Sequence, residues 1–309
     1  MIENKGLLAR LLLVVLALIW GSSFILVKKG LVALGPMEVG ALRIVAASLC
    51  LFPFGVRYFK YIEKREWVYL ISVGFCGSLI PSFLFAFAQT RLPSGVTGIL
   101  NTLVPIFTIL IAALIFKHKQ PGRAYLGVVV GFVGSVVLVM AGGGGLAGIN
   151  YYAFLVFLAT VFYATNVNLI KEYLQGQKAL AITSVSLLLV GPIPIYFLLA
   201  HTDFIEKLGT VPGAATSALY VTLLGVMGTA VALIIFNHIV RLTNPVFTSS
   251  VTYIIPIVAV GWGLIDGETL NLMHLGGMAL ILAGVYVTNK RSKGPVQNKV
   301  KVEQQELAK

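Results

Sequence analysis

Long apolar segments recur along the whole chain, and short polar or charged stretches separate them. A helix needs roughly 20 apolar residues to cross the hydrocarbon core of a bilayer, and such segments are present throughout. Only 11% of the residues are charged, whereas a soluble domain carries about a quarter. Because the apolar runs are continuous and do not alternate with polar residues, they favour helices over a β-barrel. The sequence therefore predicts an all-α polytopic membrane protein.

Ten such segments can be delimited, which predicts ten transmembrane helices. The first is too long for a signal-peptide core and has no clear cleavage site, so we interpret it as an uncleaved helix. The predicted helices cover approximately residues 7–27, 36–54, 67–87, 94–116, 125–140, 152–170, 180–199, 215–240, 245–265 and 275–287.

The basic residues predict how these helices are oriented. The net charge is +12, which in a soluble protein would suggest nucleic acid as a partner. With the N-terminus in the cytosol, however, 18 of the 23 Lys and Arg residues fall in cytosolic segments and only four on the opposite side. This distribution follows the positive-inside rule. We expect a multi-pass protein of the cell membrane with both termini cytosolic and no nucleic-acid partner.

The reactive side chains indicate neither a metal site nor an enzyme. Cys50 and Cys76 lie inside apolar runs and lack metal-site spacing, and the four histidines are scattered over loops and helix ends. The sequence therefore predicts no metal, no cofactor and no catalytic residue.

Two stretches of the chain, residues 91–105 and 241–256, repeat one pattern. Each opens with Arg-Leu and a small polar cluster and becomes a long apolar segment with a proline inside it. Polar residues stand four and eight positions before each proline, on one helix face. They are Thr97 and Asn101 before Pro105 in the first copy, and Thr248 and Thr252 before Pro256 in the second. We expect the difference between Asn101 and Thr252 to orient the substrate.

The repeat extends beyond this pair. Gly127 and Gly134 recur 150 residues later as glycines 277 and 284, and residues 20–28 align with residues 163–171 at an offset of 143. Because five helices is an odd number, the second half must run the opposite way through the membrane. The sequence predicts a first repeat over residues 1–141, a glycine-rich linker over 142–149, a second repeat over 150–289, and a disordered cytosolic tail over 290–309. Two inverted five-helix repeats with a midplane site form a transporter architecture.

Several motifs resemble the EamA-type members of the drug/metabolite transporter superfamily. They are Trp20-Gly-Ser-Ser-Phe, Pro36 followed by Arg43 and Ile-Val-Ala-Ala, Gly228-Thr-Ala, and Pro256 followed by Gly267-Glu268 and Gly276-Gly277. The resemblance covers roughly residues 10 to 290 and implies a ten-helix exporter or importer of small metabolites, often amino acids. One departure is that Phe116-Lys117-His118 stands in the first half where the second has Gly267-Glu268.

Polar side chains near the helix centres are the candidate cavity residues. A proline leaves the carbonyl four positions earlier without its helical donor, so each proline offers a kink and a free carbonyl beside a polar side chain. Outside these stretches, the candidates are Trp20 and Ser23 in the first predicted helix and Tyr163, Asn166 and Asn168 in the sixth. Aromatic walls with a few polar groups suit an amphipathic metabolite. The alternatives are kink repair or helix packing for the polar residues, and an interfacial belt for the aromatic ones.

Arg43 is the one basic residue well inside a predicted span, and a charge at that depth indicates function. It follows Glu38 by five residues, so the two are candidates for charge recognition or gating. The alternative is a structural Glu38–Arg43 pair at the outer helix end, with the arginine reaching the headgroups.

The predicted function is transport of a small polar or amphipathic metabolite, such as an amino acid, by export or exchange through alternating access. The partners are a small-molecule substrate and the lipid bilayer. A proton-coupled exporter of lipophilic cations is the alternative, but such antiporters need a carboxylate at membrane depth, which most spans lack. The Gly127–Gly131 motif indicates close helix packing, either within one chain or in a dimer, so monomer and homodimer both remain open.

Overall fold

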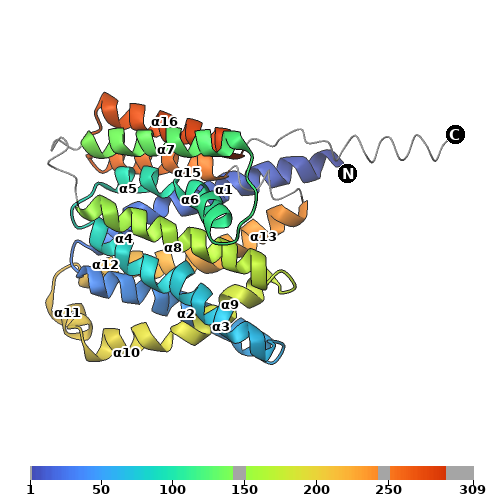
Figure 1. Cartoon of the computed structure of the whole chain (residues 1–309). Coiled ribbons are helices and arrows are strands. Elements are labelled where there is room, and N and C mark those ends of the chain that lie inside the picture. The colour runs from blue at the N-terminus through green and yellow to red at the C-terminus, as the bar shows by residue number, and fades with distance from the viewer. Residues whose placement is uncertain (1, 142–150, 243–250, 290–309) are drawn as a thin grey trace.

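The computed structural model describes residues 2–141, 151–242 and 251–289, and within these ranges it is built from helices (Figure 1). Eight of the helices are long and apolar enough to cross a membrane, and two shorter apolar helices, Val251–Ile265 and Leu272–Thr288, follow them. The described part of the chain thus supports the predicted all-α polytopic fold. The predicted linker over 142–149, Thr248 and the predicted tail over 290–309 lie outside the described residues.

The helices follow one another in the order that the apolar segments predict. In the first half they are α1 (Ile2–Gly30), α2 (Pro36–Phe59), η1 (Lys64–Glu66), α3 (Trp67–Gly74), η2 (Phe75–Leu79), α4 (Ile80–Ala88), α5 (Ser94–Asn101), α6 (Val104–Leu114) and α7 (Gly122–Met140). In the second half they are α8 (Tyr151–Tyr173), α9 (Ala179–Val190), α10 (Pro192–Ala200), α11 (Phe204–Thr210), α12 (Ala214–Gly225), η4 (Val226–Val231), α13 (Ala232–Leu242), α15 (Val251–Ile265) and α16 (Leu272–Asn289). The short helix α11 was not predicted.

Several predicted single spans are interrupted. The predicted helix over 94–116 divides into α5 and α6 at Thr102 and Leu103, whose amides bond three residues back, to the carbonyls of Ile99 and Leu100. Pro105 explains the break, because it cannot donate to the carbonyl of Asn101. Its counterpart Pro256 lies inside the continuous helix α15. The two proline segments are therefore not alike: the first half has a break where the second keeps its helix.

Two π-helical turns occupy equivalent positions in the two halves. The spans α3–α4 and α12–α13 each contain a π-helical segment, η2 and η4, in which the chain bulges by one residue. Such bulges are rare and occur frequently at functional sites. Gly77 and Ser78 of η2 correspond to Gly228 and Thr229 of η4, each 151 residues later. The repeat therefore extends to a local irregularity that the hydrophobic pattern does not reveal.

A second matching irregularity follows the fourth and ninth predicted helices. Lys117 has φ 56° and Gly267 has φ 83°, so both adopt the left-handed conformation at positions that are 150 residues apart. The next helices, α7 and α16, begin at Gly122 and Leu272. The chain therefore turns in the same way after both proline segments, although only the second copy has the glycine that this conformation favours.

The helices α7 and α16 pack side by side along their lengths (Figure 1). A Cβ atom at Gly284 would stand 2.5 Å from the Gly131 backbone nitrogen and 2.6 Å from the Gly127 backbone oxygen. A Cβ atom at Gly277 would meet the Gly134 backbone oxygen at 2.9 Å. The small-residue face predicted from the sequence is therefore occupied within one chain, since only glycine allows this approach.

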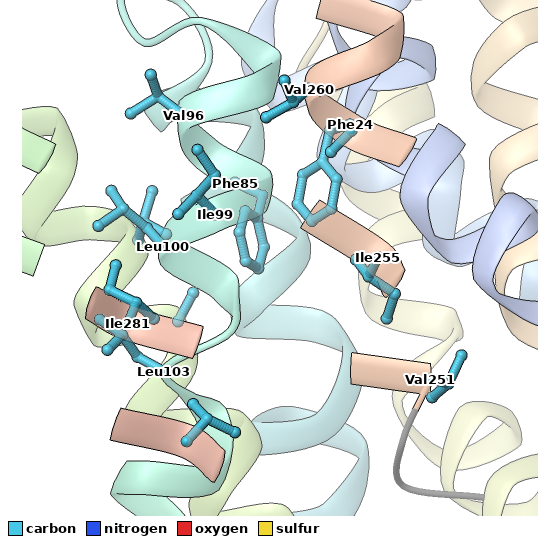
Figure 2. Packing of buried hydrophobic residues seen from close by; sticks show 14 of the residues in the cluster. Phe24, Phe85, Val96, Ile99, Leu100, Leu103, Val251, Ile255, Val260 and Ile281 are labelled. Carbon is cyan, nitrogen blue, oxygen red and sulfur yellow. The ribbon is translucent and has the colours of Figure 1, made fainter. Parts of the chain in front are cut away.

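The core lies where α5 and α15 meet α1 and α8. Figure 2 shows Phe24, Phe85, Ile99 and Ile255 converging there, and each is at most 7% exposed. Phe24 and Phe85 meet edge to face, with their ring centroids 5.9 Å apart. This packing places the middle of both proline segments beside the centre of the bundle.

Candidate functional site

A central cavity of about 390 Å³ lies among the helices of both halves. Pockets for small molecules are typically of about 300–1,000 Å³ and carry a few polar groups on apolar walls. Seven of the predicted site residues line it: Trp20, Ser23, Arg43, Asn101, Tyr163, Asn166 and Thr252. Side chains far apart in the sequence therefore meet around one space.

The lining is built from pairs of equivalent positions in the two repeats. At the offset of 143 that aligns α1 with α8, Trp20 corresponds to Tyr163 and Ser23 to Asn166. At an offset of 151, Asn101 corresponds to Thr252. Further pairs that line the cavity are Phe24 with Val167, Val27 with Ile170, Gly77 with Gly228, and Ser78 with Thr229. Both halves thus contribute the same positions, as a site between repeats requires.

The π-helical turns hold the cavity side chains in place. The Trp20 Nε1–H donates to the Gly228 carbonyl at 3.0 Å, which links α1 to η4. The two turns also make equivalent contacts with Asn166 and Ser23: a Cβ atom at Gly77 would stand 2.7 Å from the Asn166 side chain. A Cβ atom at Gly228 would stand 3.3 Å from the Ser23 Oγ. Glycine is therefore required most strictly at position 77, where the Asn166 amide lies directly against the backbone.

Other predicted residues do not line the cavity. Thr97 is fully buried and donates to the Pro93 carbonyl one turn back at 3.0 Å. Asn168 is 1% exposed and donates to the carbonyls of Thr108 at 3.0 Å and Ala164 at 2.9 Å, which ties α8 to α6. The lining residues also leave out the two prolines, 105 and 256, which shape the helices instead. The hydrogen bonds of Thr97 and Asn168 are contacts of the kind that the sequence suggested as the alternative, kink repair or helix packing.

Glu38 lies at the start of α2, away from the cavity. Its carboxylate accepts from the Gly35 amide at 2.6 Å and from the Lys207 ammonium at 2.9 Å, and its side chain is 4% exposed. Its partner is therefore Lys207 and not Arg43. The intrahelical Glu38–Arg43 pair, considered as an alternative, is absent from the described residues.

Sequence reasoning missed several lining residues. They are Phe85, the glycine and hydroxyl pairs of the two π-helical turns, Thr183 and Ser186. Gln89 also lines the cavity, and its amide near the end of an apolar span is a signal that the sequence does carry. The π-helical turns have no pattern of their own, because a bulge changes which face the following residues present without changing hydrophobicity.

Several polar atoms at the cavity lack partners among the described residues. They are Asn101 Oδ1, Asn166 Oδ1, and both Gln89 amide atoms. A buried polar group without a hydrogen bond is costly, so such groups in a native protein call for a ligand, ion or water. The cavity is therefore suited to a ligand that carries hydrogen-bonding groups.

Ion pairs join several elements at one end of the bundle, and we name them the Lys28–Glu268 cluster. The Lys28 ammonium contacts Asp266 and Glu268, each at 2.8 Å, and Lys29 pairs with Asp266. The Glu268 carboxylate also accepts from the Ser94 amide at 2.7 Å and hydroxyl at 2.8 Å, and from the Gly95 amide at 3.0 Å. The cluster thus joins the end of α1, the beginning of α5 and the turn after α15.

The ionised form of Glu268 is stabilised in this cluster. Burial by itself raises the pKa of Glu268, but hydrogen bonds from Lys28, Gly95 and Ser94 outweigh it and hold the pKa below its ordinary value. The Lys28 and Lys29 hydrogen bonds likewise lower the pKa of Asp266. A lowered carboxyl pKa contributes stability that is present above the ordinary value and is lost as the pH falls through the lowered one.

A pH series of melting temperatures tests this contribution. Wild type is expected to melt above Glu268→Gln by a constant margin between about pH 5 and pH 8, and the margin is expected to shrink below about pH 4. The reason is that only the wild-type carboxylate becomes protonated. Glu63→Gln, which changes an exposed pair, serves as the control with no such margin. A margin that grows on acidification would contradict the lowered pKa.

The equivalent turn in the first half carries a different pair. His118 stands at the position that corresponds to Glu268, and its Nε2 lies 3.3 Å from Glu172 of α8. Glu172 corresponds to Lys29 at the offset of 143. The basic and acidic partners are thus exchanged between the two ends, and a histidine stands where the second repeat has the carboxylate of Glu268.

Comparison with known proteins agrees with this architecture. A model of the EamA-like transporter family matches residues 7–140 and again residues 150–290. The chain is 24% identical to the uncharacterized inner membrane transporter YedA of Escherichia coli (strain K12), with 87% of each chain covered. It is 25% identical to a probable terminal-alkyne amino-acid exporter of Streptantibioticus cattleyicolor, covering 91% of this chain and 93% of the relative. It is also 25% identical to a probable amino-acid metabolite efflux pump of Salmonella typhimurium, with coverages of 93% and 95%.

A solved crystal structure has the same fold. It superposes with a TM-score of 0.62 at 17% sequence identity and covers 90% of this chain and 95% of its own. The family match extends over nearly the whole chain, and the described helices supply the membrane spans that a transporter needs. This protein is accordingly a member of the EamA-like transporter family.

Proposed function

We propose that the protein moves a small amphipathic metabolite, such as an amino acid, across the cell membrane by alternating access around the central cavity. The observation that carries this proposal is the lining itself, in which equivalent positions of the two repeats face one space. A cavity shared by two inverted repeats can open to either side when one repeat rocks against the other.

The walls of the cavity indicate what kind of molecule fits. Trp20 and Tyr163 supply flat apolar surface, and Tyr163 stacks on Phe85 with the ring centroids 5.9 Å apart. Asn101 and Asn166 offer amide oxygens without partners. An amino acid with an apolar side chain combines both requirements. The two relatives named for amino-acid export or amino-acid metabolite efflux support the same substrate class.

The ion pairs indicate which state the structure represents. On the predicted topology, the ends of α1 and α15 lie at the outer face, so the Lys28–Glu268 cluster closes that side. We propose that the described conformation is closed to the outside, with both termini in the cytosol. In this inverted arrangement we propose that the first repeat ends at residue 141 and the second begins at residue 150. Whether the protein works as a monomer or a homodimer does not affect this mechanism.

Counterflow in proteoliposomes tests the proposal. Vesicles loaded with unlabelled L-phenylalanine, L-methionine or L-leucine are expected to accumulate the labelled amino acid faster than protein-free vesicles. Counterflow also detects exchange without an imposed ion gradient, because the outward gradient of unlabelled amino acid drives it. If folded, reconstituted protein produced no counterflow with any of the three, the amino-acid class would be rejected.

Nothing in the cavity favours the proton-coupled exporter of lipophilic cations. Among the described lining residues there is no aspartate or glutamate, and the one charged side chain is the cation Arg43. A lipophilic cation would be repelled by it, and a proton antiporter needs a carboxylate at membrane depth. Transport of ethidium that is driven by a pH gradient and abolished by Glu268→Gln would favour the exporter instead.

The close contact at Gly77 gives a prediction about the transport rate. Gly77→Ala is expected to lower the counterflow rate about tenfold, because the new methyl displaces the Asn166 amide, and tenfold corresponds to about 1.4 kcal/mol. Gly261→Ala is the matched control, since a Cβ atom there meets nothing within 4 Å. Equal rates for the two variants would show that the position of Asn166 does not matter.

A further inference from the structure

Arg43 breaks the symmetry of the cavity more strongly than the Asn101–Thr252 difference does. At the offset of 143 its counterpart is Ser186, and both residues line the cavity. Packing supports this pairing. A Cβ atom at Gly225 would stand 2.5 Å from the Arg43 carbonyl oxygen, and one at Gly74, the equivalent glycine, would stand 2.8 Å from that of Ser186. One side of an otherwise matched site therefore carries a positive charge.

The guanidinium of Arg43 has no acidic partner in the part of the chain that the structure describes. The carboxylate nearest in sequence, Glu38, is held by Lys207 and the Gly35 amide. The remaining described ion pairs use Asp266, Glu268, Glu63 and Glu172 with other cations. Arg43 also lies seven residues into α2, about 10 Å from its start at 1.5 Å per residue. An uncompensated charge at that depth is costly unless it meets water or a ligand.

We infer that Arg43 binds the carboxylate of the transported molecule, and that this contact selects carboxylates over neutral or cationic analogues. The inference rests on the proposed transport function. A guanidinium presents parallel N–H groups that match a carboxylate in a bidentate pair. The ligand then supplies the negative charge that the described cavity lining lacks.

The rest of the lining is compatible with the other end of an amino acid. Asn101 and Asn166 line the cavity and their buried Oδ1 atoms have no donor among the described residues, so rotation of these side chains lets them accept from an ammonium group. Trp20 and Tyr163 also line the cavity, and aromatic rings attract cations as well as apolar side chains. The substrate is therefore oriented by charge, with its carboxylate toward α2 of the first repeat.

Matched acids and amides test the inference. Binding of L-phenylalanine, L-methionine and L-leucine to purified protein is measured by titration calorimetry, alongside the carboxamide of each. Wild type is expected to bind the acids at least about tenfold more tightly than the amides, since a charge-assisted hydrogen bond of this kind supports such a ratio. Arg43→Gln is expected to lose this preference, with affinity for the acids falling about 10- to 100-fold.

Two further variants keep the test decisive. Arg43→Lys keeps the positive charge but loses the parallel N–H donors of the guanidinium. It is therefore expected to retain a smaller preference for the acids, even where Arg43→Gln folds poorly. Arg57→Gln, an exposed arginine near the other end of the same helix, is expected to leave both affinities within about twofold. Equal binding of acids and amides by wild type, or an unchanged preference in Arg43→Gln, would overturn the inference.

The outcomes separate the inference from the function on which it rests. Counterflow of the amino acids without any preference over the amides would leave the transport proposal standing and remove the role of Arg43. Absence of both binding and counterflow with all three amino acids would reject both.

Discussion

Replacing Glu268 with alanine is expected to lower the melting temperature of the purified protein by roughly 6–10 °C. The side chain is 5% exposed and accepts hydrogen bonds from Lys28, Ser94 and Gly95. Removing the carboxylate leaves the Ser94 and Gly95 donors without an acceptor and takes from Lys28 one of its two carboxylate partners, and together these losses cost about 3–5 kcal/mol. At about 2 °C per kcal/mol for a chain of this size, this loss of stability corresponds to a fall of roughly 6–10 °C in the melting temperature.

The control is another ion pair that lies on the surface. Glu63 and Arg65 are 60% and 81% exposed, so Glu63→Ala is expected to change the melting temperature by less than about 2 °C. Both variants are measured in one detergent at neutral pH. Similar shifts for Glu268→Ala and Glu63→Ala would contradict the structural role of the Lys28–Glu268 cluster. The reason is that Glu268 differs from Glu63 in its burial and in the Ser94 and Gly95 donors from which it accepts.

Replacing Gly284 with alanine is expected to destabilise the protein by about 3 kcal/mol. The added methyl would stand 2.5 Å from the Gly131 nitrogen, 2.6 Å from the Gly127 oxygen and 2.7 Å from the Gly131 Cα. All three are backbone atoms, which cannot move away by changing a rotamer. The helices α7 and α16 must therefore separate over their most closely packed region. A melting curve in detergent is the measurement.

A neighbouring glycine on the same helix provides the control. A Cβ atom at Gly276 meets nothing within 4 Å, and alanine has a higher helix propensity than glycine by about 1 kcal/mol. Gly276→Ala is therefore expected to be neutral or slightly stabilising. The two substitutions are chemically identical, so their opposite signs isolate the helix contact. A Gly284→Ala variant as stable as Gly276→Ala would show that α7 and α16 do not pack as described.

Much of the fold could be predicted from the sequence, because in a membrane the apolar segments themselves define the helices. The ten predicted segments correspond to the eight long and two shorter apolar helices. The glycine face of α7 and α16 was also visible, since Gly127 and Gly134 recur at a fixed distance as Gly277 and Gly284. Whether that face packs within the chain could not be predicted, because periodicity does not identify the partner.

Some of the predicted site residues line the cavity and others do not. Trp20 and Tyr163 could be paired from the repeat alone, and both line the cavity. Thr97 shares a helix face with Asn101, and Asn168 lies two residues from Asn166, but the side chains of Thr97 and Asn168 bond to nearby carbonyls. A helix pattern gives the face of a residue and not its depth or its hydrogen-bond partner. The lining residues Thr183 and Ser186 are ordinary hydroxyls in an apolar span and carry no signal.

The role of Arg43 could not be decided from the sequence alone. From the sequence, pairing with Glu38 and a functional charge were equally compatible with the residue. In the structure Glu38 pairs with Lys207. Arg43 lines the cavity, and so does its neutral counterpart in the second repeat, Ser186. The asymmetry expected between Asn101 and Thr252 is therefore accompanied by a larger one between a cation and a hydroxyl.

The central claim is that both repeats face one solvent-accessible substrate cavity. Single cysteines at positions 101 and 252 test it most directly, in a chain whose Cys50 and Cys76 are replaced by alanine. Both are expected to react with a membrane-impermeant thiol reagent and to be protected by a saturating transported amino acid. Leu100→Cys, at a fully buried position, is expected to stay unreactive. Failure of Asn101→Cys and Thr252→Cys to react from either side of the membrane, or labelling that the amino acid does not slow, would contradict the shared cavity.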